Sequence, residues 1–168
     1  MAATLLRNGI VLPLDGSRTV LDPGSVLFDG VEILAVGPVE ELDADPRSAG
    51  ATVVDATGHA VLPGLHNGHM HSGLLRGTAE SMSLFDWLEA YVDPAHRVVT
   101  PEIARAASFL AYTENLRFGN TSVMDMWRHM EGSAEAADAV GIRAILVPYV
   151  ADEEGYDYFE TLESNLAL

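Results

Sequence analysis

The stretch Leu62-Pro-Gly-Leu-His-Asn-Gly-His-Met-His71 decides how the rest of the chain is interpreted. Side chains of a strand alternate between its two faces, so we expect Asn67, His69 and His71 to share one face. Two imidazoles placed in this way can bind one cation from the same side, and neutral histidine suits zinc or iron. A His-x-His pair also arises by chance, so its position in the fold has to support the metal interpretation.

The neighbours of this pair have expected roles of their own. The same alternation puts His66 and Met70 on the opposite face, so we predict that His66 is structural. Pro63-Gly64 and Gly68 allow the backbone to turn and to come close to whatever is bound. The metal interpretation therefore rests on His69 and His71 alone.

Composition excludes several classes of function. The 168 residues include 9 Lys+Arg, all of them arginine, against 25 Asp+Glu, which gives a formal net charge of −16. This balance disfavours binding to nucleic acid and to anionic membrane surfaces. The chain has no cysteine, so disulfides and thiolate metal sites are excluded. Histidine and carboxylate remain as the strong metal ligands.

Hydropathy indicates a globular, soluble chain. With 48% hydrophobic and 20% charged residues it can bury a core, as one domain or as part of a larger one. Arg7, Asn8 and Asp15 interrupt the N-terminal segment before a signal-peptide core could form. No run approaches the roughly 18 apolar residues of a membrane span. We therefore predict a cytoplasmic protein.

The first third of the chain predicts a small β unit. The expected strands are residues 4–14, 25–28, 31–36, 52–55 and 59–62. Asp29-Gly30 is a dipeptide favoured in tight hairpins. Residues 40–50 are acidic and lack periodicity, which indicates a surface loop. This unit contains no arrangement of residues that suggests chemistry.

From residue 62 onward the pattern changes to alternating strands and helices. The expected strands are residues 62–71, 121–127 and 142–150, and the expected helices are residues 84–92, 100–118, 133–140 and 157–168. Thr100 and Pro101 are typical of a helix start. Apolar strands joined by helices predict a parallel sheet, whose sites form at the C-terminal ends of the strands. His69 and His71 lie at that end, which favours a metal site.

Several motifs match one known family. The matching residues are Val54–Gly58, Pro63-Gly64-Leu65, Asn67, His69-x-His71, Leu75-Arg76-Gly77, Leu84-x-x-Trp87-Leu88 and Thr121-x-Val123-x-Asp125-Met126. On these residues the chain resembles the amidohydrolase superfamily. The resemblance is to the branch of the S-adenosylhomocysteine/methylthioadenosine deaminases, cytosine deaminase and triazine hydrolases. It covers essentially the whole chain.

The resemblance implies both a fold and a metal. The expected fold is α/β: part of a small β-sandwich at residues 1–61, then the N-terminal part of a (β/α)8 TIM barrel, about three βα units, at residues 62–168. His69 and His71 would be first-strand ligands of a catalytic Zn²⁺ or Fe²⁺. Asp125, grouped with Val123 and Trp127 on the inward-facing side of its strand, would be a structural hydrogen-bonding residue near the site.

Four further residues are candidates for contact with the substrate. They are Trp87, His96, Arg76 and His129. Each has a structural alternative, such as core packing for Trp87, a carboxylate partner for Arg76 and solvent exposure for His129. The odds between these roles rest on position alone.

The chain departs from the family pattern where substrate is recognised. The family's nucleoside deaminases carry a Glu two residues after the proline that follows the Trp-Leu helix, where it contacts ribose hydroxyls. Here Pro94 is followed by Ala95 and His96. The loop between His71 and Arg76 is also about two residues shorter. We therefore expect a small non-nucleoside substrate.

A second departure concerns completeness. The family's other metal ligands lie on later barrel strands, as does the Glu that transfers protons, and this sequence has about three of the eight strands. We therefore expect no catalytic acid or base in this chain and a second polypeptide that supplies the remaining strands and ligands. The predicted function is the small subunit of a split, two-chain amidohydrolase that hydrolyses a C–N bond by deamination or by amide or amidine hydrolysis. The alternatives are a catalytically silent fragment or binding module of this fold and a truncated single-chain deaminase.

Overall fold

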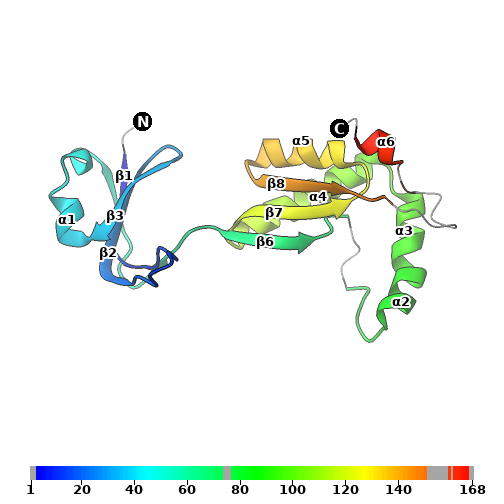
Figure 1. Cartoon of the computed structure of the whole chain (residues 1–168), viewed down its shortest axis with the longest axis horizontal. Helices are drawn as coiled ribbons and strands as arrows, with labels where there is room; N and C mark the ends of the chain where they lie inside the picture. The colour runs from blue at the N-terminus through cyan, green and yellow to red at the C-terminus, as the bar shows by residue number, and fades with distance from the viewer. Residues whose placement is uncertain (1–2, 74–76, 151–158, 160, 167–168) are drawn as a thin grey trace. The chain divides into compact units, whose positions relative to one another are not determined.

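The structure is a computed structural model, and it describes residues 3–73, 77–150, 159 and 161–166. The chain divides into two compact units, Met1–Pro63 and Gly64–Leu168 (Figure 1). The predicted helix at 157–168 and the candidate residue Arg76 fall partly or wholly outside the described residues.

The first unit is built on a five-stranded sheet. Its strands are β1 (Thr4–Val11), β2 (Leu21–Asp29), β3 (Glu32–Pro38), β4 (Thr52–Asp55) and β5 (Ala60–Val61). The strand order is β3-β2-β1-β4, and β5 also pairs with β1. The predicted hairpin is confirmed, since β2 and β3 pair antiparallel and Gly30 between them has a φ of 56°. Leu5, Leu27 and Leu42 form the buried core of this unit.

The loop predicted at residues 40–50 is wrong. This segment contains the helix α1 (Val39–Asp43) and the 3₁₀ helix η1 (Pro46–Ser48). Val39 and Leu42, three residues apart, share one helix face, and both are buried. The burial of these two apolar side chains stabilises a short helix. The acidic residues around them had led to the prediction of a loop.

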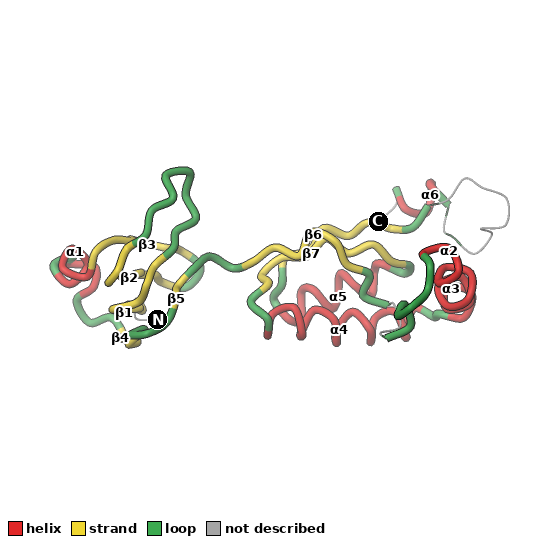
Figure 2. The backbone as a smooth tube through the Cα atoms, turned by 90° about the horizontal axis from the view of Figure 1, so that it is seen from below, coloured by secondary structure: helices red, strands yellow, loops and turns green. Residues whose placement is uncertain are grey.

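The second unit is a three-stranded parallel sheet with helices. Its strands are β6 (Leu65–Met70), β7 (Asn120–Trp127) and β8 (Arg143–Pro148), in the order β6-β7-β8. Both strand pairs are parallel, which confirms the predicted sheet. The helices α4 (Pro101–Arg117) and α5 (Met130–Val140) lie together on one side of it (Figure 2).

The ends of these helices follow from local sequence. The Thr100 hydroxyl accepts a hydrogen bond from the Ile103 backbone N–H at 3.3 Å, and Pro101 occupies the first turn of α4. After α4 the chain passes through Gly119, with a φ of 84°, and α5 ends at Gly141, with a φ of 76°. These left-handed conformations favour glycine and stop both helices.

The other two predicted helices differ from the structure. The segment expected to end at residue 92 comprises α2 (Leu84–Trp87) and a π-helical turn, η2 (Leu88–Val92), and continues through α3 (Asp93–Val98). Pro94 is tolerated because it lies in the first turn of α3, where its missing N–H costs little. The last predicted helix is observed as α6 (Leu162–Asn165), with 157–158, 160 and 167–168 outside the described residues.

The two faces of the β6–β7–β8 sheet differ in burial. On the face covered by α4 and α5, the side chains of Val123, Asp125 and Trp127 are at most 3% exposed. On the opposite face, which we call the open face, Met124 is 41% and Ile145 is 60% exposed. Within the described residues β6 and β8 each pair only with β7, so the sheet does not close into a barrel.

None of the helices in the described parts of the chain combines the length and the apolar character needed to span a bilayer.

Candidate metal site

The strand β6 contains an irregularity that sets the direction of its side chains. Asn67 pairs with Val123, but Met70 pairs with Asp125, so three steps along β6 match two steps along β7. As a result Asn67 and Met70 both face α4, where the Asn115 side chain lies 2.9 Å from Asn67 and 3.7 Å from the Met70 sulfur. The prediction that Asn67 shares a face with His69 and His71 is therefore wrong.

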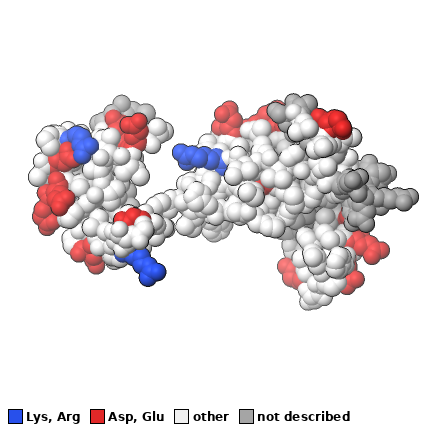
Figure 3. Space-filling model, in the orientation of Figure 1, with Lys and Arg blue, Asp and Glu red and all other residues white. Residues whose placement is uncertain are grey.

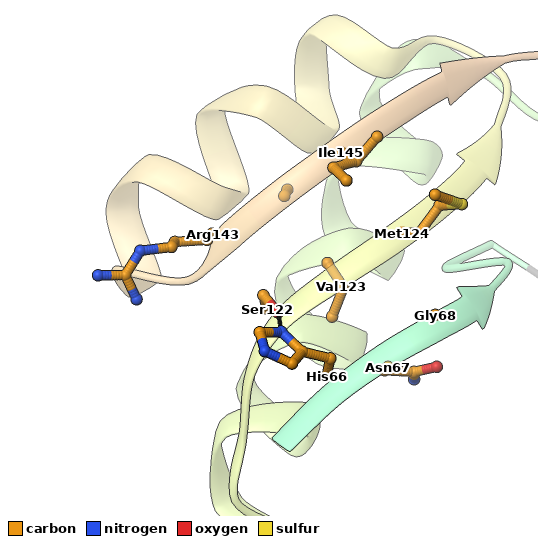
Figure 4. A pocket seen from close by; sticks show the side chains of 9 residues that line it. His66, Asn67, Gly68, Ser122, Val123, Met124, Arg143 and Ile145 are labelled. Carbon is orange, nitrogen blue, oxygen red and sulfur yellow. Dashed lines mark hydrogen bonds between the residues drawn. The ribbon is translucent and has the colours of Figure 1, made fainter. Parts of the chain in front are cut away.

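The same irregularity brings all three histidines of this strand to the open face. His69 and His71 line a hollow of about 110 Å³ together with Met124 and Met126. His66 was expected on the other face, but its ring lies on the open face and hydrogen-bonds the Ser122 hydroxyl (Figure 4). The strict alternation of side chains between the two faces fails here, because the extra residue in β6 reverses which face the residues before it occupy.

A close approach of β6 to β7 explains the glycine at its start. A Cβ on Gly64 would lie 2.2 Å from the Thr121 hydroxyl, closer than any side chain tolerates. Gly64 thus lets β6 begin directly beside β7, a packing role that the sequence did not predict. His69 and His71 lie at the other, C-terminal end of β6.

The two imidazoles converge through their Nε2 atoms. His69 Nε2 and His71 Nε2 are 2.9 Å apart, and the rings meet edge to face with centroids 4.8 Å apart. His71 Nδ1 lies 2.8 Å from the Met126 carbonyl oxygen. A carbonyl can only accept, so we assign the proton to Nδ1, which leaves His71 Nε2 with a free lone pair. The Tyr149 hydroxyl lies 3.3 Å from the same Nδ1 atom.

This donor set fits part of a zinc or iron site. Zn–N bonds are about 2.0–2.1 Å long, so two of them can span the observed 2.9 Å between the Nε2 atoms. The hydrogen bond from Nδ1–H to a carbonyl is the usual support for a metal-binding histidine. Catalytic zinc sites use three protein ligands, and the described residues contain no cluster of three or more His, Cys, Asp or Glu that could hold a metal. A catalytic zinc site at this pair would need a further protein ligand from outside the described residues.

Behind the histidine pair lies a buried carboxylate. Asp125 is fully buried, and its two oxygens accept hydrogen bonds from the Ser72 backbone N–H at 2.9 Å and from the Tyr112 hydroxyl at 2.7 Å. Burial and the neighbouring Asp125 charge raise the pKa of Tyr112 far above its ordinary value. Asp125 was expected on the inward face, but it faces α4. The expected hydrogen-bonding role is observed there.

The candidate substrate residues have different surroundings. Trp87, on α2, is half-buried, and its indole N–H donates to the Thr78 hydroxyl at 3.0 Å. His129 follows β7 with a left-handed backbone, φ 57°, and is half-buried at the start of α5. Arg76 lies outside the described residues. Substrate contact by these residues stays a prediction.

His96 has the most defined surroundings of the four candidates. Its side chain, on α3, is only 1% exposed, and its ring lies 4.3 Å from the Trp127 ring and 4.9 Å from the Tyr149 ring, measured between centroids. Burial, helped by the nearby Arg128 charge, lowers the pKa of His96 to about 4. The ring is therefore neutral at pH 7 and packs as an aromatic group, while its contact with substrate stays a prediction.

A second, larger hollow lies on the open face near the N-terminal ends of the strands. It measures about 410 Å³, and His66, Ser122 and Arg143 contribute its polar groups beside the apolar Met124 and Ile145 (Figure 4). In barrels of this type functional sites form at the opposite, C-terminal ends of the strands. We therefore assign this hollow to the uncovered surface of the open face and do not treat it as a candidate active site.

Surface charge agrees with the composition. Acidic side chains are spread over both units and basic ones are few (Figure 3). No basic surface of the kind that binds nucleic-acid phosphates stands out on this face.

Comparison with known proteins identifies the family. The model of the amidohydrolase family matches residues 60–166, more than half of the chain, so the chain belongs to this family. It is 41% identical over 147 residues to a 5-methylthioadenosine/S-adenosylhomocysteine deaminase of Syntrophobacter fumaroxidans, covering 86% of this chain and 33% of the relative. It is 36% identical over 148 residues to a 5'-deoxyadenosine deaminase of Methanosarcina mazei, covering 87% and 33%.

Solved structures of two zinc-containing relatives share the fold. The atrazine chlorohydrolase TrzN from Arthrobacter aurescens TC1 complexed with zinc matches with a TM-score of 0.77 and 25% identity, covering 97% of this chain and 40% of that one. An adenosine deaminase from Xanthomonas campestris with bound zinc matches with a TM-score of 0.76 and 26% identity, covering 98% and 37%. The predicted resemblance and fold class are confirmed.

The matches cover only part of each relative. The chain spans about a third of the length of the curated relatives it matches. It therefore corresponds to an N-terminal portion of an amidohydrolase, whose relatives are hydrolytic deaminases.

Proposed function

We propose that this chain is the N-terminal portion of a metal-dependent hydrolase that cleaves a C–N bond of a small substrate. The observation that carries the proposal is the convergence of His69 Nε2 and His71 Nε2, 2.9 Å apart on the open face. The Met126 carbonyl supports it, because it holds His71 in the tautomer that a metal ligand needs.

The residues of this chain would have limited and distinct roles in the reaction. A Zn²⁺ or Fe²⁺ ion, when bound, activates water for attack on an sp² carbon that carries an amine or a similar leaving group. His69 and His71 supply two ligands, and Met126 and Tyr149 hold the His71 ring in place. The general acid–base group and the remaining ligands come from outside this chain.

The remaining barrel strands, in this proposal, belong to a second polypeptide. Two features support this arrangement: the unpaired outer edges of β6 and β8 within the described residues, and the exposed apolar side chains of Leu65, Met124 and Ile145. Parallel strands normally have both faces covered. A silent fragment and a portion of a single longer enzyme are the competing arrangements.

The substrate we propose is a small amino-substituted heterocycle without a ribose. His96 stands two residues after Pro94, where the family's ribose-binding Glu is expected, and an imidazole lacks the pair of carboxylate oxygens that accept hydrogen bonds from ribose hydroxyls. An adenosine-type nucleoside is the second candidate, favoured by the identity of 41% to a methylthioadenosine/S-adenosylhomocysteine deaminase.

Ammonia release on matched substrates tests both candidates. Protein isolated from its own source, with any associated polypeptide retained, would be loaded with zinc and assayed on free amino-heterocycles and on the corresponding nucleosides. We expect turnover of free heterocycles, loss of turnover in His71→Ala, and little change in His66→Ala. Turnover of nucleosides alone would select the second candidate. Absence of any C–N hydrolysis by the zinc-loaded assembly would contradict the proposed function.

Native mass spectrometry tests the two-chain arrangement separately. We expect the 18.0 kDa chain in complex with a larger polypeptide and about one metal ion per pair. A single longer polypeptide that includes this sequence would replace the two-chain arrangement with an ordinary enzyme. A lone, metal-free chain would support a silent fragment.

A further inference from the structure

One face of α4 carries polar side chains toward the metal-binding strand. Ser108, Tyr112 and Asn115 are spaced four and three residues apart, so they lie on the same side of the helix. Ser108 and Tyr112 are fully buried and Asn115 is half-buried, which is unusual for three successive polar positions facing a sheet. We call these three residues the α4 polar face.

Two members of this face hold the residue that follows His71. The Ser108 hydroxyl lies 3.0 Å from the Ser72 hydroxyl. Tyr112 donates to one oxygen of Asp125, whose other oxygen accepts the Ser72 backbone N–H at 2.9 Å. Both the side chain and the main chain of Ser72 are thus fixed from the helix side, and with them the C-terminal end of the strand.

The third member holds the irregular part of β6. The Asn115 side-chain oxygen accepts a hydrogen bond from the Asn67 amide at 2.9 Å. The Asn67 oxygen in turn accepts the His69 backbone N–H at 3.3 Å. The Asn115 amide donates to the Ala111 carbonyl at 2.9 Å, which fixes its orientation on the helix.

We propose that the α4 polar face positions the metal-binding pair: Asn115 acts on His69 through Asn67, and Tyr112 and Ser108 act on His71 through Asp125 and Ser72. This inference rests on the proposed function, since it gives His69 and His71 a metal to bind. The three residues touch neither metal nor substrate, so they are positioning residues. Their contacts end on backbone or side-chain groups within one residue of a histidine or on its own N–H.

Apolar packing of α4 on the sheet would not by itself fix the backbone conformation of β6, whereas hydrogen bonds can. An apolar interface fixes the distance between a helix and a strand but leaves the rotation of a bulged backbone free to adjust. Buried hydrogen bonds are directional and costly to leave unmade, so they select one backbone conformation. Loss of partners that hydrogen-bond metal ligands directly typically weakens metal binding about 10–100-fold, and partners that act through one intervening residue should have the smaller end of this effect.

Zinc affinity of the assembled protein tests the proposal. Tyr112→Phe removes one hydroxyl and Asn115→Ala one amide, and each is expected to weaken zinc binding several-fold, up to about tenfold. The matched control is Thr100→Ala, which destabilises α4 by removing its N-terminal cap but leaves the α4 polar face intact. Zinc affinity should be nearly unchanged in this control. Equal losses in all three variants would overturn the proposal, because helix stability alone would then explain the effect.

A conservative pair at Asp125 provides a rescue experiment. Asp125→Asn retains an oxygen that can accept the Ser72 N–H and an amide that can donate to the Tyr112 oxygen, whereas Asp125→Ala retains neither. We expect Asp125→Asn to bind zinc more tightly than Asp125→Ala at equal folded fraction, as measured by circular dichroism. Indistinguishable affinities for the two variants would contradict positioning through this carboxylate.

A readout without metal separates failure of this inference from failure of the proposed function. In the metal-free full chain, Asn115→Ala should speed hydrogen exchange of the His69 amide, and Tyr112→Phe that of the Ser72 amide, relative to Thr100→Ala. If the wild-type protein binds no zinc, the proposed function fails, and these exchange rates together with the ¹⁵N shifts of the His69 and His71 rings decide whether the α4 polar face fixes the pair. Unchanged rates and shifts would overturn the inference.

Discussion

The two faces of the β6–β7–β8 sheet differ in how complete they are. The face toward α4 and α5 has a finished core, in which Val123 and Trp127 are buried and Asp125 has both oxygens hydrogen-bonded. The open face carries exposed apolar side chains and the histidine pair. Within the described residues, one face of the sheet is therefore packed and hydrogen-bonded, whereas the face that carries the histidine pair is uncovered.

Trp127→Ala should have the largest effect on the stability of the covered face. The side chain is 1% exposed and fills the space beside Ala104 and Met130, so its removal leaves a cavity that costs about 3–5 kcal/mol of unfolding free energy. Met124→Ala on the open face is the matched control and should cost less than about 1 kcal/mol. Urea unfolding followed by circular dichroism measures both. Similar costs for the two variants would show that the faces do not differ as described.

Acid should weaken the covered face through His96. Its pKa is lowered from 6.5 to about 4 in the folded chain, chiefly by burial and then by the Arg128 charge, so the unfolded chain binds more protons between these values. The neutral His96 contributes its full share to the unfolding free energy above pH 6.5, and this share is lost as pH falls toward 4. Because one pKa unit corresponds to about 1.4 kcal/mol, the loss amounts to roughly 3 kcal/mol.

His96→Phe isolates that contribution, because phenylalanine keeps an aromatic ring beside Trp127 and Tyr149 but cannot bind a proton. The unfolding free energy of this variant should fall less steeply with acid between pH 6.5 and 4 than that of the wild type. Parallel curves for the two proteins over this range would contradict the assigned pKa. Exposed carboxylates titrate alike in both and cancel in the difference.

Thr100→Ala should have a smaller effect. The hydroxyl of Thr100 accepts the Ile103 N–H at the start of α4, and loss of such a cap costs about 1 kcal/mol. The same urea experiment measures it, with Thr100→Ser as a control that keeps the hydroxyl. A variant with serine that is as unstable as the alanine variant would show that the cap contributes nothing.

Ile145→Glu should have the smallest effect on the isolated chain and a large one on the proposed assembly. The side chain is 60% exposed on the open face, so the substitution should change the unfolding free energy by about 0.5 kcal/mol or less. A carboxylate there would be buried without a partner once other barrel strands cover the sheet. Native mass spectrometry should therefore show loss of the complex from a folded chain. An intact complex would indicate that the open face is not the covered surface.

The parallel sheet and its helix ends could be predicted from sequence because local rules decide them. Thr100, Pro101 and Gly141 act through their own backbone preferences, and the apolar strands at residues 121–127 and 142–150 need no distant information. The hairpin at Asp29-Gly30 is of the same kind. Where the sequence pattern and the structure agree, the cause lies within a few residues.

The orientation of the strand at the site could not be predicted from sequence because it depends on pairing. One extra residue in β6 relative to β7 reverses the expected faces of His66 and Asn67, and no local signal marks it except Gly68. The contacts of Tyr112 and Asn115 were missed for a similar reason, since they join α4 to residues more than ten positions away. A polar stripe at helical spacing among the α4 residues that face the sheet is the signal that could have found them.

The zinc content of the assembled protein tests the central claim most directly. Wild type should hold about one ion, and His69→Ala and His71→Ala should lose it, because each removes a ligand. His66→Ala, on the same strand and the same open face, should keep the ion because its ring bonds Ser122 instead. Zinc retained in His69→Ala and His71→Ala, or lost equally in all three variants, would contradict the assignment of this pair as metal ligands.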